Sequence, residues 1–138
     1  MIVPLGRSLM AAELPVLRAH DLSMWGYVVL LALTEGPTRT QAALAQAIGA
    51  DKTRIIGVLD ELQDRGLIER RPDPADRRAH LLSLTPPGLR LRESVQADIQ
   101  RREERLLDRL PPGDRAAFLR ALHALTDLPQ EEIADPVG

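Results

Sequence analysis

Two short amphipathic segments follow one another closely in the middle of the chain, and each ends at a glycine. In the first, apolar side chains recur at helical spacing up to Gly49. Its start can be capped by Thr40, or by Thr38 through a Thr-x-x-Gln capping box that ends at Gln41. The second segment begins after Asp51, another good helix cap. The pattern predicts two helices joined by a tight turn.

The second of these helices, predicted over Lys52–Arg65 with Gly66 as its stop, has two different faces. Its buried face is formed by Ile55, Val58, Leu59 and Leu62. Its opposite face is formed by Thr53, Gly57, Asp60 and Asp64, with Arg54 and Ile56 on the flanks. Cationic and polar groups occupy the first turn and carboxylates the later turns. Only the N-terminal half is expected to lie against a polyanion, because phosphates repel the acidic half.

An arginine-rich hairpin is predicted next. The strand-like segments Leu67–Arg71 and Ala79–Leu84 flank the turn residues Pro72–Asp76. Two helices joined by a Gly-containing turn and followed by a hairpin are the parts of a winged helix-turn-helix. In such units the start of the second helix meets base edges in the major groove. Arginines on the hairpin can reach phosphates or a narrow minor groove.

Helices are also predicted before this unit. Leu5–Ala19 is loosely periodic, and Pro15 is expected to kink or break any helix that crosses it. Met24–Thr34 is apolar on every side, so it is expected to be enclosed by other helices. Ser23 can cap this second helix, and the Glu-Gly-Pro sequence after it should end it.

After the hairpin, a long helix is predicted from Thr85 to about Leu110, and another over Asp114–Thr126. The Pro-Pro-Gly sequence between them should break the chain's helical course, and the tail Pro129–Gly138 is expected to be frayed. Both helices carry apolar stripes that a small winged unit cannot cover alone. A second copy of the chain is expected to cover them.

The composition narrows the class of protein. The 138 residues suit one domain. The hydrophobic content is 44%, yet it includes only one Trp, one Tyr and one Phe. This composition predicts a mainly helical fold with a small β-hairpin wing. The absence of cysteine excludes disulfides, thiolate catalysis and thiol redox sensing. The longest apolar run, Met24–Leu33, is about half of the ~20 residues that cross a bilayer, and no secretory signal is recognisable. A cytoplasmic location is expected.

Charge is balanced rather than basic. The net charge is -2, and the segment from Asp51 to His80 holds seven Lys or Arg and seven Asp or Glu. A basic edge must therefore come from the placement of charges, and a winged-helix module that binds another protein instead of DNA stays an alternative. His20, His80 and His123 lack metal-ligand spacing, and no phosphate loop or nucleophile elbow occurs. Neither an enzyme nor a cofactor is expected.

The stretch Gly49–Gly88 resembles the MarR-type transcriptional regulators. Its most specific part is similar to the family's Asp-x-Arg wing signature and the Leu-Thr-x-x-Gly that follows, here Asp76-Arg77-Arg78, Leu84-Thr85 and Gly88. Residues 40–45 and the surroundings of Trp25 also resemble the family, so that about residues 5–125 follow its pattern.

The resemblance implies one MarR-like domain over residues 1–138 that forms a homodimer on double-stranded, palindromic operator DNA. Residues 36–86 would form the winged helix-turn-helix, residues 5–22 and 87–127 the dimerisation helices, and residues 128–138 a flexible tail. The two recognition helices would meet successive major grooves about one helical turn apart. A repressor that a small-molecule ligand can release is expected.

The residues expected at the DNA are Thr40, Gln41, Lys52, Thr53, Arg54, Gly57, Arg77 and Arg78. Arg78 matches the family's minor-groove arginine, and Asp76 matches the aspartate that holds it in place. The chain has Ile56 and Gly57 where many members carry Thr and Arg. The isoleucine could touch a thymine methyl. The glycine either lets the backbone approach DNA closely, or it reflects local packing or drift.

Family members often bind phenolic or other small apolar anions between the dimer helices and the DNA-reading part. The matching neighbourhood of this chain contains Arg18, His20, Trp25 and Tyr27. Core packing is the alternative, and simpler, explanation for the two aromatic residues. Members that sense peroxides use cysteine, so the resemblance does not imply that route here.

Overall fold

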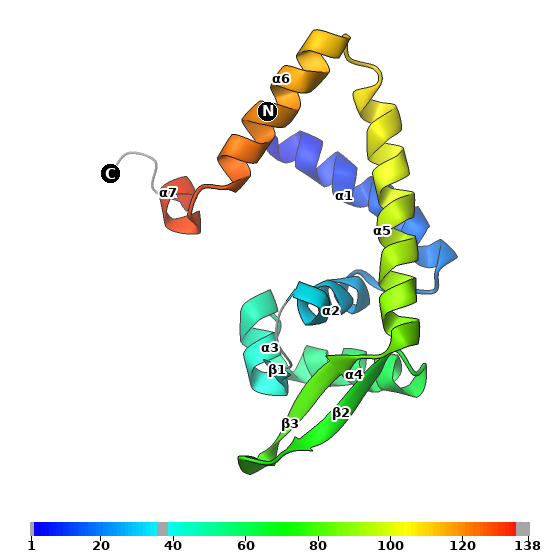
Figure 1. Ribbon diagram of the computed structural model, residues 1–138, viewed down its shortest axis with the longest axis vertical. Coiled ribbons are helices and arrows are strands. Elements are labelled where there is room, and N and C mark those ends of the chain that lie inside the picture. The colour runs from blue at the N-terminus through cyan, green and yellow to red at the C-terminus, as the bar shows by residue number, and fades with distance from the viewer. Residues whose placement is uncertain (1, 36–38, 135–138) are drawn as a thin grey trace. The chain divides into compact units, whose positions relative to one another are not determined.

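The computed structural model describes residues 2–35 and 39–134 and forms two compact units, which meet in sequence between Ile99 and Gln100. Figure 1 shows the elements in chain order: α1 (Ile2–Ala19), α2 (Met24–Glu35), β1 (Arg39–Thr40), α3 (Gln41–Ile48), α4 (Lys52–Asp64), β2 (Ile68–Asp73), β3 (Asp76–Leu84), α5 (Pro86–Leu107), α6 (Pro112–Thr126) and α7 (Gln130–Ala134). The prediction of a mainly helical fold with a small hairpin wing is confirmed.

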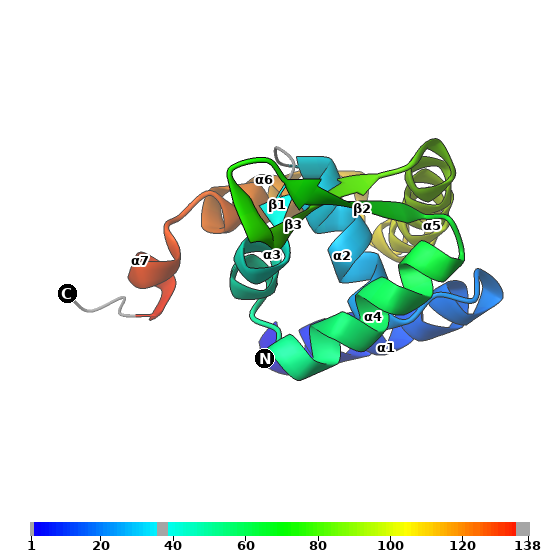
Figure 2. The same ribbon diagram turned by 90° about the horizontal axis from the view of Figure 1, so that it is seen from below.

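The core of the first unit is built around α2, which contacts α1, α3, α4 and β3 (Figure 2). Val29 and Leu30 in its centre are completely buried, as is Leu82 of β3. The apolar stripe predicted for α4 is confirmed, because Ile55, Leu59 and Leu62 are buried and Val58 packs partly against them. In the described part of the chain no single helix is long and apolar enough to cross a membrane; α1 and residues 24–34 pass that test only jointly, across an 89° bend.

Local hydrogen bonds fix the helix ends where the sequence predicts them. Thr40 accepts from the Ala43 amide (3.1 Å), and Asp51 accepts from the Thr53 amide (3.1 Å). Ser23 caps α2 in the same way, at Gly26. The glycines that end α3 and α4 have φ angles of +67° and +71°, in the left-handed region that favours glycine. The alternative cap, Thr38, lies outside the described residues.

The sheet is larger than the sequence predicts. β1, two residues long, pairs antiparallel with β3, giving the strand order β1-β3-β2. The turn of the hairpin is only Pro74-Ala75, so the longer turn predicted over Pro72–Asp76 is wrong. Pro72 joins the ladder opposite His80 because β2 is an edge strand, where a missing N–H can face away from β3.

Helix boundaries near prolines also differ from the prediction. α1 begins at Ile2 and runs through Pro15, so the possible break is not found; the residue is exposed, which leaves water to satisfy the carbonyl that proline cannot bond. α5 ends at Leu107, three residues early, and α6 starts at Pro112 because proline suits the first helical position. Part of the tail predicted to fray forms α7, which has acidic residues in its first turn.

In the second unit, an arginine of α6 forms ion pairs with two carboxylates at and just after the end of α5. The Arg115 guanidinium bonds the carboxylates of both Glu104 and Asp108. The hydrogen bond with Glu104 is the main cause that raises the pKa of Arg115 above its ordinary value. These contacts join the two helices across the Pro-Pro break, although exposed ion pairs stabilise a fold only slightly.

The Leu-Thr-x-x-Gly sequence forms the joint between hairpin and α5. Thr85 donates its hydroxyl to the Gly66 carbonyl (2.6 Å) and its amide to the Leu67 carbonyl (3.1 Å), and its hydroxyl accepts from the Gly88 amide (3.1 Å). A Cβ atom on Gly88 would lie 2.0 Å from the Leu67 carbonyl oxygen. Glycine is therefore required by this close approach of two backbones.

We expect Gly88→Ala to lower the free energy of unfolding by about 1–3 kcal/mol or more, since backbone has to move to admit the methyl group. Denaturant unfolding measures the change. Gly57→Ala is the matched control, because a Cβ there meets nothing within 4 Å. Equal stability of Gly88→Ala and wild type would show that the approach is not required.

Candidate nucleic-acid interface

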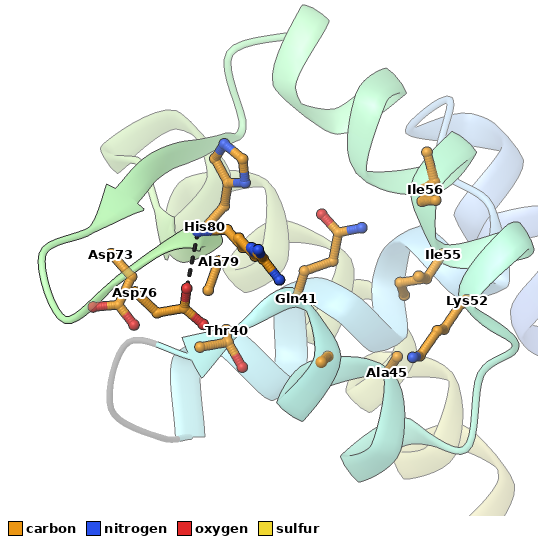
Figure 3. Close-up of a pocket in the computed structure, with 12 residues that line it drawn as sticks. Thr40, Gln41, Ala45, Lys52, Ile55, Ile56, Asp73, Asp76, Ala79 and His80 are labelled. Atoms are coloured by element: carbon orange, nitrogen blue, oxygen red, sulfur yellow. Dashed lines mark hydrogen bonds between the residues drawn. The ribbon is translucent and has the colours of Figure 1, made fainter.

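An open cavity of about 510 Å³ lies between the starts of α3 and α4 and the hairpin (Figure 3). Its lining includes Thr40 and Gln41 at the start of α3, Lys52 at the start of α4, and Arg78 and His80 on β3. Helix N-termini carry unpaired amides and a positive dipole end. The cavity therefore gathers cationic and hydrogen-bonding groups from three elements that are separate in sequence, and the carboxylates of Asp73 and Asp76 also line it.

The exposed face of α4 changes its charge along its length, as the sequence predicts. Lys52, Thr53 and Arg54 are all exposed in the first turn, followed by Ile56, which is 46% exposed. The later turns expose Asp60, Glu61 and Asp64. Of α4, only the first half borders the cavity, so the cationic and polar groups of its first turn lie apart from the carboxylates of its later turns.

Gly57 has no packing reason among the residues that the structure describes. It is exposed in the middle of α4, and a Cβ atom added to it meets nothing within 4 Å. A glycine in a helix interior costs about 1 kcal/mol relative to alanine. The sequence left three explanations open, a close approach to DNA, local packing or drift, and the described residues give no support to local packing.

The carboxylates at the hairpin tip bind backbone rather than arginine. Asp73 accepts from the Ala75 amide (2.9 Å), and Asp76 accepts from the Arg78 amide (2.9 Å; dashed line in Figure 3). Asp76 therefore bonds the main chain of Arg78, the residue that the resemblance implied it would hold in place. Arg77 and Arg78 are exposed, and no carboxylate pairs with either guanidinium in the described part of the chain.

The other two arginines of the hairpin form ion pairs with carboxylates. Arg70 forms an ion pair with Asp60 of α4, and Arg71 pairs with Glu69 at 2.9 Å. The hairpin thus sorts its four arginines into two paired residues on β2 and two unpaired residues at the start of β3. This sorting leaves two guanidinium groups without an ion pair in the segment Asp51–His80, whose summed charge is zero.

His80 is a candidate that the sequence argument missed. It lines the cavity beside Arg78, and also a second cavity of about 610 Å³ with Asp60 and Asp64. The available signal was its position two residues after Arg78, because alternate residues of a strand share a face. Among the described residues no group of three His, Asp or Glu could hold a metal ion.

The four residues predicted near an effector have separate surroundings. Tyr27 is 7% exposed and belongs to the core, and Arg18 is exposed. His20 lies 2.7 Å from Asp98 on α5. Trp25 is half-buried, and the Arg54 guanidinium lies over its ring at 6.0 Å from the centroid. The predicted effector site stays a prediction.

The helix pair α3 and α4, with α4 in the place of the DNA-reading helix, and the antiparallel hairpin of β2 and β3 beside it, with arginines near its tip, define a winged helix-turn-helix protein. The family model described as MarR family matches residues 20–79. A regulatory protein for the hcr operon of Thauera aromatica is 31% identical over 99 residues, which cover 72% of this chain and 60% of that protein. The repressor NicR of Pseudomonas putida is 32% identical over 73% of this chain and 64% of its own length. The chain belongs to the MarR family of transcriptional regulators.

Solved structures agree with this assignment. The repressor CouR, bound to a 23-mer DNA duplex, is 28% identical with a TM-score of 0.74, covering 91% of this chain and 89% of that one. PcaV of Streptomyces coelicolor, in complex with its natural ligand, is 29% identical with a TM-score of 0.65, covering 89% of each chain. The matches span less than two thirds of the length of the Thauera and Pseudomonas relatives. The prediction that the chain is not an enzyme agrees with its membership of a family of transcriptional regulators.

Proposed function

We propose that the chain acts as a homodimeric regulator that binds double-stranded DNA through the cavity face of its first unit. The observation that carries the proposal is the unpaired state of Arg77 and Arg78 at a hairpin tip whose carboxylates are bound to backbone. Guanidinium groups without carboxylate partners can bind phosphates at little cost. CouR, a relative of the same fold, is known bound to duplex DNA.

The position of each proposed contact residue in the fold supports a specific role for it at the DNA. Lys52, Thr53 and Arg54 start the reading helix and meet base edges or flanking phosphates in the major groove. Ile56, exposed beside them, meets a thymine methyl group. Thr40 and Gln41 bring the start of α3 to the phosphate backbone, as helix N-termini do. The wing residues Arg77 and Arg78 lie along the adjacent minor groove.

Dimerisation is supported by apolar faces that each unit leaves open when taken by itself. In the first unit, α1 exposes Ile2 (77%), Val3 (63%) and Met10 (57%). In the second unit, α6 has no buried residue among those described and exposes Phe118 and Leu125. Apolar surface of this kind marks a protein interface. A second copy of the chain is its proposed partner, and a two-fold dimer requires a palindromic operator.

Repression and release by a small molecule complete the proposal. NicR is a repressor, and PcaV binds a natural ligand. An effector site on this chain would involve the neighbourhood of Arg18, His20, Trp25 and Tyr27, and no cofactor is required. The protein would act in the cytoplasm, where bacterial-type operators lie.

Selection of bound duplexes from a random pool tests the function as a whole. We expect inverted repeats whose half-site centres lie about one helical turn apart, because two-fold pairing sets the spacing of the reading helices. Single half-sites without inverted symmetry would contradict the dimer. Failure to retain any duplex would favour the alternative, a winged-helix module that binds a protein.

The charge of the wing predicts a defined salt dependence. We expect Arg78→Ala to weaken duplex binding and to reduce the slope of log affinity against log salt by about one unit, because one fewer counterion is released. Fluorescence anisotropy of labelled duplex measures it. Arg71→Ala is the control on the same hairpin, since Arg71 already pairs with Glu69, and its slope should stay near that of wild type. Equal slopes for all three proteins would remove Arg78 from the interface.

Gly57→Ala should separate stability from binding. We expect the free energy of unfolding to rise by up to about 1 kcal/mol, because alanine favours the helix. Operator affinity should fall about tenfold, because the methyl group separates α4 from the DNA. Gln63→Ala, on the acidic half of the same helix, is the control for binding. Unchanged operator affinity of Gly57→Ala would mean that the glycine has no role at the DNA.

A further inference from the structure

The single tryptophan of the chain contacts the reading helix. Trp25 stands in the first turn of α2, half-buried, and the guanidinium carbon of Arg54 lies 6.0 Å from the centroid of its ring. This distance is within the range of a cation–π contact. The two residues are far apart in sequence, so the contact exists only because α2 packs against α4.

Arg54 has no competing carboxylate partner. No ion pair involves it in the described part of the chain, and the nearby Asp51 carboxylate accepts from the Thr53 amide. The aromatic ring is thus the group that restricts this long side chain. Lys52, on the same turn, instead lines the open cavity.

A restricted arginine reads DNA better than a free one. Its planar guanidinium can bond the O6 and N7 atoms of guanine in a bidentate manner, which requires a defined orientation. A side chain already ordered loses less entropy on binding. Because only a base contact requires that orientation, the benefit should appear in sequence discrimination more than in general affinity.

We propose that Trp25 is a positioning residue for sequence readout, whose ring holds Arg54 in the orientation that meets the base edge. The proposal rests on the proposed DNA-binding function. It assigns Trp25 a role in specificity that neither core packing nor an effector site provides.

A double-mutant cycle tests the role. Trp25→Leu should lower the ratio of operator affinity to random-duplex affinity about two- to five-fold, and Trp25→Phe, which keeps a ring, should lower it less. In an Arg54→Ala background the same substitution should have no further effect on the ratio. In a Lys52→Ala background, the matched control, its effect should persist in full. Leu31→Ala, another partly buried change in α2, controls for loss of stability.

The tryptophan emission of the free protein tests the contact without DNA. Arg54→Ala should shift the emission maximum, because a charge leaves the face of the ring, whereas Lys52→Ala should leave it unchanged. Additive effects of Trp25→Leu and Arg54→Ala on the affinity ratio would overturn the proposal, as would equal emission of wild type and Arg54→Ala. If wild type binds no duplex, the proposed function fails, while the emission measurement still reports whether Arg54 occupies the ring.

Discussion

The close approach between Leu67 and Gly88 is the constraint on which the interface depends. The Leu67 amide closes the end of α4 on the Leu62 carbonyl (2.9 Å), and its carbonyl accepts from Thr85 at the end of the hairpin. One residue therefore joins the end of the reading helix, the start of β2 and the start of α5. Because Gly88 lacks a side chain, the two backbones can approach this closely. The direction of the wing relative to α4, and with it the cavity between them, follows from this backbone contact.

The placement of charged side chains on the hairpin is the second constraint, and it results from ordinary local hydrogen bonds. Asp73 and Asp76 form turns with their own backbone, as aspartate often does near a tip, so that one oxygen of each carboxylate bonds a backbone amide instead of an arginine. Exposed ion pairs such as Arg71 with Glu69 contribute little to stability. Their consequence here is spatial, since they pair the guanidinium groups on β2 and leave those of Arg77 and Arg78 without an ion pair in the described residues. A chain of net charge -2 can in this way present guanidinium groups that are open to phosphates.

Features set by neighbouring residues could be predicted from the sequence, whereas features set by distant ones could not. Thr40 and Asp51 cap their helices because the bonded amides lie two or three residues away. β1 was missed because two residues, Arg39–Thr40, carry no strand pattern and become a strand only through pairing with β3. Pro72 was taken for a turn residue because its tolerance depends on β2 being an edge. The contact of Arg54 with Trp25 likewise depends on helix packing.

Long-range contacts also attach the end of the reading helix to the segment that joins α1 and α2, and its start to the first turn of α2. At its end, the Arg65 guanidinium donates to the backbone carbonyls of Asp21 (2.5 Å) and His20 (3.3 Å). At its start, Arg54 lies over Trp25, which follows that segment by only a few residues. Asp21 holds a φ of +52°, unusual for a residue other than glycine. His20 in turn bonds Asp98 of α5. These contacts make the orientation of the reading helix depend on the α1–α2 corner as well as on the helix itself.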